Sequence, residues 1–198
     1  MPPSSERQLS SRRFWFALGA IVVLAVGIRV GYLVGWKRDA EPCTIVPPKQ
    51  LCGDAVVYHE GAKLLVDGKG FIRPIEYEWN GKVVHAADHP PLFMLYLSAF
   101  TLVGLGTVVD HQLAGVLLGA VTVVLVGVAG RRIGSPRVGL IAAFLTATYA
   151  LIWVNDLLVM SETLAITTTA GMVLAAYAYW QSRSRRAAIA LGVLGGLA

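Results

Sequence analysis

Long apolar segments alternate with short basic segments along most of this chain. A helix needs about 20 residues to cross the hydrocarbon core of a bilayer, and four apolar segments come near that length: 14–36, 111–129, 138–154 and 163–180. A fifth apolar segment, 187–198, stops well short of it. The pattern predicts an all-α integral membrane protein with several spans. We expect the fifth segment to be the start of another span, so that this chain is the N-terminal part of a larger protein.

The first apolar segment is expected to stay in the mature protein as an anchor. It is longer than the apolar part of a secretory signal peptide, and no clear small-residue cleavage site follows it. Trp15 and Trp36 lie near its two ends, as is typical of tryptophans at membrane interfaces.

Composition and charge agree with this class. Only 15% of the residues are charged, whereas a soluble domain has about 25%. The formal net charge is +5, and much of the excess comes from three arginine clusters: Arg7, Arg12 and Arg13; Arg131, Arg132 and Arg137; and Arg183, Arg185 and Arg186. Because each cluster is a short patch beside apolar segments, it argues against nucleic-acid binding and marks a cytoplasmic segment.

The arginine clusters also predict the orientation. They place residues 1–13 in the cytoplasm as a tail and residues 37–110 outside as a large extracytoplasmic loop. Both ends of the apolar run 92–106 must then lie outside. We therefore expect juxtamembrane helices at about 55–67 and 91–106, with an ordinary transmembrane helix as the alternative for the second.

The outer loop contains two further local signals. Cys43 and Cys52 are the two cysteines of the chain, and both fall on the oxidising side of the membrane. A disulfide between them is expected, and two free thiols are the alternative. An Asn-Gly pair at Asn80 and Gly81 lies between extended residues and predicts a hairpin turn.

Four charged or titratable residues have both a structural and a functional interpretation. Asp54 opens an amphipathic helix, where it is either an N-cap or a base or metal ligand. His89 precedes two prolines, where it either belongs to a helix cap or binds phosphate. Glu162 opens the fourth apolar segment and either complements the helix dipole or faces a cavity. Arg29, inside the first apolar segment, either snorkels outward or binds an anion.

Five short motifs in this order resemble membrane glycosyltransferases of the GT-C superfamily. The resemblance is to glycosyltransferase family 39, which includes protein O-mannosyltransferases, and to the aminoarabinose transferases of lipid A; it covers about residues 14–190. The motifs are GDAVVYHEGAKLL at 53–65, GKGF at 68–71, DHPPL at 88–92, RRIG at 131–134 and MSETL at 160–164.

The resemblance implies a reaction. These enzymes take a sugar from a polyprenyl-phosphate carrier and transfer it, with inversion, to an acceptor on the outer face. The acceptor is a protein, a lipid or a cell-wall glycan. By this resemblance Asp54 is the general base and Glu162 the second acid, while Tyr58, Asp88 and His89 bind substrate. The implied setting is the plasma membrane, and the Gly-, Ala- and Val-rich spans suit a bacterium.

The chain departs from its relatives at two positions. Val57 stands where some relatives have arginine, and His89 stands where many have lysine, so two expected phosphate contacts are altered. The cations that could replace them are Arg29, Lys63, Lys69 and Arg73. A divalent cation, Mg or Mn, held by Asp54 and Glu162 is left open.

Two other classes of function compete with an enzyme. A lipid-linked-sugar transporter or flippase typically carries ionisable groups at the middle of the bilayer in broken helices, whereas the acids here cluster at one boundary. A non-catalytic scaffold subunit would tolerate loss of Asp54.

Overall fold

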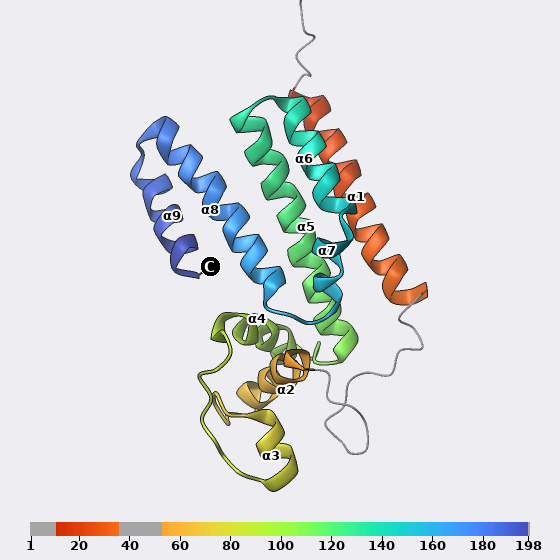
Figure 1. Cartoon of the computed structure of the whole chain (residues 1–198), viewed down its shortest axis with the longest axis vertical. Coiled ribbons are helices and arrows are strands. Elements are labelled where there is room, and N and C mark those ends of the chain that lie inside the picture. Colours follow the sequence, from red (N-terminus) through yellow and green to blue (C-terminus); the bar gives the residue numbers. More distant parts are fainter. Residues whose placement is uncertain (1–10, 36–52, 198) are drawn as a thin grey trace, which may run out of the picture.

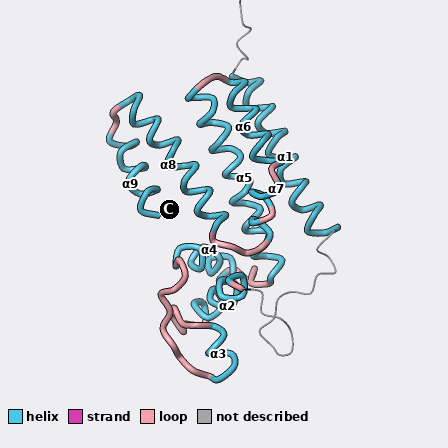
Figure 2. Tube along the Cα trace, viewed as in Figure 1, coloured by secondary structure: helices cyan, strands magenta, loops and turns pink. Residues whose placement is uncertain are grey.

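The computed structural model describes residues 11–35 and 53–197. Within these residues the regular elements are helical, apart from an isolated antiparallel bridge between Ile72 and His85 (Figure 2). The predicted all-α fold class is therefore confirmed. Cys43 and Cys52 fall outside the described residues, so their disulfide stays a prediction.

Four long helices form a bundle that accounts for most of the molecule (Figure 1). They are α1 (Ser11–Gly35), α5 (Val108–Ile133), α6 (Pro136–Thr148) and α8 (Glu162–Ser182). The shorter elements α7 (Ala150–Trp153) and η1 (Asn155–Leu157) connect α6 to α8, and α9 (Arg185–Leu197) turns back along α8. Among the described helices, α1 and α5 are long and apolar enough to cross a membrane. A third candidate span joins α6 to residues 150–157 through a bend of 60°, whereas the predicted span 163–180, now α8, does not reach the same length and hydropathy.

Helix α5 lies at the centre of the bundle and packs on α1, α6 and α8. Its glycines let neighbouring backbones come close. A Cβ atom on Gly130 would lie 3.0 Å from the Cα of Gly139 on α6, and a Cβ atom on Gly139 would overlap the carbonyl oxygen of Gly127. Small residues that allow such close approach are typical of helix packing in membranes, where van der Waals contact stabilises association.

Three short helices form a second group at one end of the bundle (Figure 1). They are α2 (Asp54–Val66), α3 (Pro74–Asn80) and α4 (Pro91–Leu102). The apolar faces of α2 and α4 pack together through Tyr58, Ala62, Phe93, Met94 and Leu97. With 12 residues, α4 spans about 18 Å, which is shorter than the hydrocarbon core of about 30 Å. This length favours the juxtamembrane interpretation, although the helix ends four residues before the predicted boundary.

The predicted hairpin turn at Asn80-Gly81 was wrong. Asn80 is the last residue of α3, and Gly81 adopts the left-handed conformation, with φ of 63°, that commonly ends a helix. Pro74 suits the first turn of a helix, so α3 forms inside the connection. The flanking segments still pair, because the Arg73 amide donates to the Val84 carbonyl at 2.8 Å.

Candidate functional site

The candidate site lies where α2, α4 and the first turn of α8 meet. Asp54 begins α2, and Tyr58 follows one turn later. The Tyr58 hydroxyl donates a hydrogen bond of 2.9 Å to Oγ of Ser161, the residue before Glu162. This bond joins the helix that carries the first predicted acid to the helix that begins at the second.

Tyr58 is the buried centre of this site, with 2% of its surface exposed. Its ring packs edge-on against the rings of His89 and Phe93, with centroids 5.4 and 5.2 Å away. Burial raises the pKa of Tyr58, the bond to Ser161 opposes the rise, and the charges of Asp54 and Glu162 add to it. Both carboxylates therefore act on this one phenol, which stays protonated and can donate at neutral pH.

Asp54 is not the N-cap of α2. Gly53 holds that position, and Asp54 is the first helical residue, with no side-chain capping bond from Gly53. The Asp54 side chain is 60% exposed, and its Oδ1 lies 3.4 Å from Nε2 of His89. Its carboxylate is thus free of a capping role and open to a ligand, while the positive end of the helix dipole favours its charged form.

His89 lies between two carboxylates. Its Nε2 faces Asp54, and its Nδ1 lies 3.7 Å from Oδ1 of Asp88. Asp88 also has Nε of Arg73 3.9 Å from its Oδ2. A hydrogen bond from its own backbone amide is the main cause that lowers the pKa of Asp88; the charges of His89 and Arg73 act in the same direction. The structure thus brings Asp54, Asp88, His89 and Arg73 together, as four of the predicted site residues.

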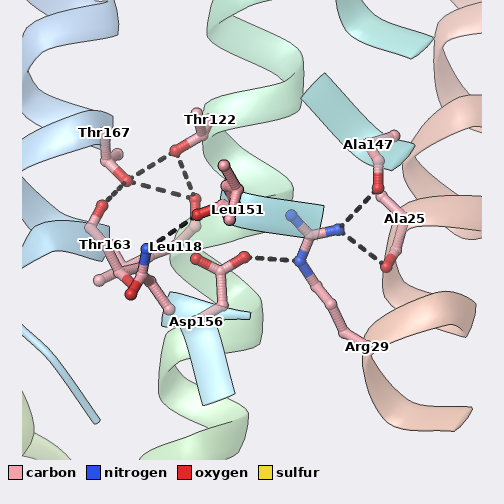
Figure 3. A network of polar contacts seen from close by, with 10 residues as sticks. Ala25, Arg29, Leu118, Thr122, Ala147, Leu151, Asp156, Thr163 and Thr167 are labelled. Atoms are coloured by element: carbon pink, nitrogen blue, oxygen red, sulfur yellow. Dashed lines mark hydrogen bonds and ion pairs between the residues drawn. The ribbon is translucent and has the colours of Figure 1, made fainter. Parts of the chain in front are cut away.

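Two predicted cations are paired elsewhere. Lys63 donates to Glu60 at 2.8 Å, one turn away on the exposed side of α2. Arg29 is fully buried in the bundle, where its Nε lies 2.6 Å from Oδ2 of Asp156 (Figure 3). This pairing does not support a role for Arg29 in binding substrate directly. The predicted role of Lys63 stays a prediction.

Sequence reasoning assigned no role to Ser161 or Asp156. Ser161 has no distinguishing signal in the sequence, because a serine before a helix is ordinarily a cap. Asp156 could have been suspected, since a buried arginine needs an acidic partner. Several acids lay on the same predicted face, however, and no local pattern singles out this one.

The predicted metal ligands Asp54 and Glu162 supply two carboxylates at this site. Across residues 11–35 and 53–197, no group of three or more His, Cys, Asp or Glu residues is arranged to hold a metal ion. The divalent cation stays a prediction, and a fuller oxygen set would have to come from substrate phosphate and water.

An apolar pocket of about 270 Å³ opens beside His89. Helices α2 and α4 and the paired segments around Ile72 and Ala86 form its walls. Its lining residues are Val57, Phe71, Ile72, Ala86, Ala87, His89, Pro91 and Met94. The pocket therefore offers an apolar surface directly next to the polar cluster.

Comparison with known proteins identifies the family. Residues 88–198, more than half of the chain, match the family described as dolichyl-phosphate-mannose-protein mannosyltransferase. The matched region includes Asp88, His89, Ser161 and Glu162, and it begins after Asp54. No curated protein and no solved structure matches the chain significantly. On this match the chain belongs to the dolichyl-phosphate-mannose-protein mannosyltransferase family of membrane glycosyltransferases.

Proposed function

We propose that this protein transfers a sugar from a polyprenyl-phosphate carrier to an extracytoplasmic acceptor, with inversion and with Asp54 as the general base. The observation that carries the proposal is the convergence of Asp54, His89 and Glu162 around the buried Tyr58, at the end of the bundle next to α4. Family membership supports the reaction class. The acceptor is a protein, a lipid or a cell-wall glycan.

The base chemistry follows from the position of Asp54. An acceptor hydroxyl is a weak nucleophile and needs a base within hydrogen-bond reach of its proton. In the proposed step, Asp54 takes this proton while the hydroxyl oxygen forms a bond to the anomeric carbon. The bond between that carbon and the phosphate oxygen breaks, and its electron pair stays on the phosphate. One direct displacement of this kind inverts the anomeric centre.

The leaving phosphate gains negative charge in this step, so nearby cations lower the barrier. His89 and Arg73 are the cationic or titratable residues that contact the Asp54–Asp88 cluster. Arg73 is 47% exposed and so is accessible to a phosphate. We assign the phosphate to these two residues, and Glu162 to orientation of the acceptor.

The position of the arginine clusters supports the proposed orientation in the membrane. Arg131 at the end of α5 lies over the Phe14 ring near the start of α1, 4.5 Å from its centroid. These two ends lie opposite the group of α2, α3 and α4, and α8 also ends on that opposite side (Figure 1). With the arginines in the cytoplasm, the candidate site faces outward across the plasma membrane of a bacterium.

The test uses the full-length protein in membranes supplied with labelled polyprenyl-phosphate sugars. Asp54→Asn should lower the transfer rate by about 100-fold or more, the usual size of a general-base effect. Asp67→Asn is the matched control, because Asp67 is an exposed acid just beyond the other end of α2. Transfer that is indifferent to Asp54 would overturn the base assignment. No transfer by the wild-type protein with any donor would favour a transporter or a scaffold.

A further inference from the structure

Arg29 and Asp156 form an ion pair in the interior of the bundle. The exposed fractions of their side chains are 0% and 2%, and Nε of Arg29 donates to Oδ2 of Asp156 at 2.6 Å. Nη1 of Arg29 also donates to the carbonyl oxygens of Ala25 at 3.0 Å and Ala147 at 3.4 Å (Figure 3). Arg29 therefore joins α1, the end of α6 and η1 at one point.

Helix α5 is shaped to receive this pair. A Cβ atom on Gly115 would overlap the backbone carbonyl oxygen of Asp156, and one on Gly119 would overlap its carboxylate. The Gln112 side chain, on the same helix, donates to the Leu157 carbonyl oxygen at 3.0 Å. Because η1 rests directly on the α5 backbone, its position depends on both the ion pair and the two glycines.

The segment from Asp156 to Glu162 is held at its other end as well. Val159 adopts a left-handed conformation with φ of 56°, which is unfavourable for a β-branched residue. Its side chain is 4% exposed and packs in the same cluster as Tyr58 and Phe93. Strain of this kind persists only where the surroundings hold it, and Ser161 then accepts the bond from Tyr58.

We propose that Arg29 and Asp156 are positioning residues for the transfer reaction. By fixing η1, the pair sets where residues 159–162 lie, and so places Ser161 and Glu162 against Tyr58 and Asp54. This inference rests on the proposed function for its catalytic consequence. Neither residue touches substrate, since both are buried and each is bound by the other.

The experiment compares full-length variants by three measurements: thermal melting, hydrogen exchange of the backbone amides of residues 155–161, and the kcat and donor KM of sugar transfer. The main variant is Arg29→Met with Asp156→Leu. Leucine branches like aspartate, and removing both charges leaves neither one buried without a partner. Arg29→Lys keeps the charge and serves as the conservative variant. Leu18→Ala is the control, because Leu18 is buried on α1 in a cluster with Phe14 and Val123, away from η1.

In the double variant we expect melting near that of wild type, faster exchange at residues 155–161 by about tenfold or more, and kcat lower by roughly 10- to 100-fold. The KM for the donor should change by less than about twofold, because the lost interaction orients groups and does not bind the donor. Arg29→Lys should be intermediate in exchange and kcat. Leu18→Ala should lower the melting temperature without these changes at residues 155–161 or in kcat.

Other outcomes would overturn the proposal. Unchanged exchange at residues 155–161 in the double variant, or in Arg29→Lys if the double variant does not fold, would show that the pair does not fix this segment. A raised donor KM with unchanged kcat would show that Arg29 binds the donor. If the wild-type protein transfers no sugar, the proposed function fails by itself, and hydrogen exchange still decides whether the pair positions residues 159–162.

Discussion

The Tyr58 hydroxyl on α2 donates a hydrogen bond of 2.9 Å to Ser161 Oγ at the start of α8. It ties the short helices outside the bundle to the segment that begins at Glu162. Since Asp54 lies one turn before Tyr58, a single phenol sets how the two predicted acids lie relative to each other.

Removing this hydroxyl should therefore impair the reaction more than the fold. Tyr58→Phe keeps the ring contacts with His89 and Phe93 but loses the bond to Ser161, at a cost of about 1 kcal/mol in the free energy of unfolding. We expect kcat to fall by about tenfold or more, because the acids lose their alignment. Transfer assays and thermal melting measure the two effects separately.

Tyr96→Phe is the matched control for this prediction. The Tyr96 hydroxyl donates to the Ala114 carbonyl oxygen at 2.9 Å, and burial raises the pKa of Tyr96 to about 12, so that it too is a neutral donor. It joins α4 to α5 without touching α8. If both variants lose the same activity, Tyr58 acts only through packing.

Stability should depend on pH through His59. Its Nδ1 lies 2.9 Å from Nδ1 of His111, so one ring must donate and the other accept. Burial lowers the pKa of His59; the charge of Glu60 opposes this and that of Lys63 adds to it, while Asp110 lies beside His111 in the chain. The folded pKa is thus below the unfolded value of about 6.5. The stabilisation is present above that value and is lost as the pH falls through the folded pKa.

Thermal melting between about pH 7.5 and pH 5 measures this effect, since the unfolded value lies between them. We expect the melting temperature to fall with pH, and the fall to be smaller in His59→Gln, which keeps a hydrogen-bonding side chain but does not titrate. An equal fall in wild type and in the variant would assign the pH dependence to other groups.

Gly119→Ala should destabilise the bundle. The added Cβ atom would overlap the Asp156 carboxylate and would lie 2.8 Å from Nε of Arg29, so we expect a loss of about 1–3 kcal/mol in the free energy of unfolding. Gly27→Ala on α1 is the control, because its Cβ atom meets nothing within 4 Å and alanine favours helix by about 1 kcal/mol. Equal melting temperatures of the two variants would contradict the close packing of η1 on α5.

His89→Gln should weaken binding of the donor. The change removes a ring that can carry positive charge beside Asp54 and Asp88, and we expect the donor KM to rise by about three- to tenfold, as for one lost charge-assisted hydrogen bond. His85→Gln is the control, because His85 is exposed in the paired segment near α3. A donor KM that is unchanged in His89→Gln would remove His89 from the phosphate site.

Some of the fold follows from local sequence alone. The apolar segments 14–36 and 111–129 coincide with α1 and α5, because the burial of apolar side chains and the helical pairing of backbone groups depend on neighbouring residues only. The resemblance also led to Asp54, Tyr58 and His89, which lie together in the structure. The Asn80-Gly81 pair misled, since its left-handed glycine ends a helix as readily as it makes a turn.

Only the tertiary structure decided the partner of Arg29. Local pattern shows that a charge lies in an apolar segment and must be compensated, but Asp156 is 127 positions away and other acids were equally plausible. The choice depends on the path of η1 over α5, which Gly115 and Gly119 allow by their missing side chains. The sequence by itself therefore determined which segments are helical and which side chains are candidates for chemistry. Close packing between distant helices decided which of those side chains meet.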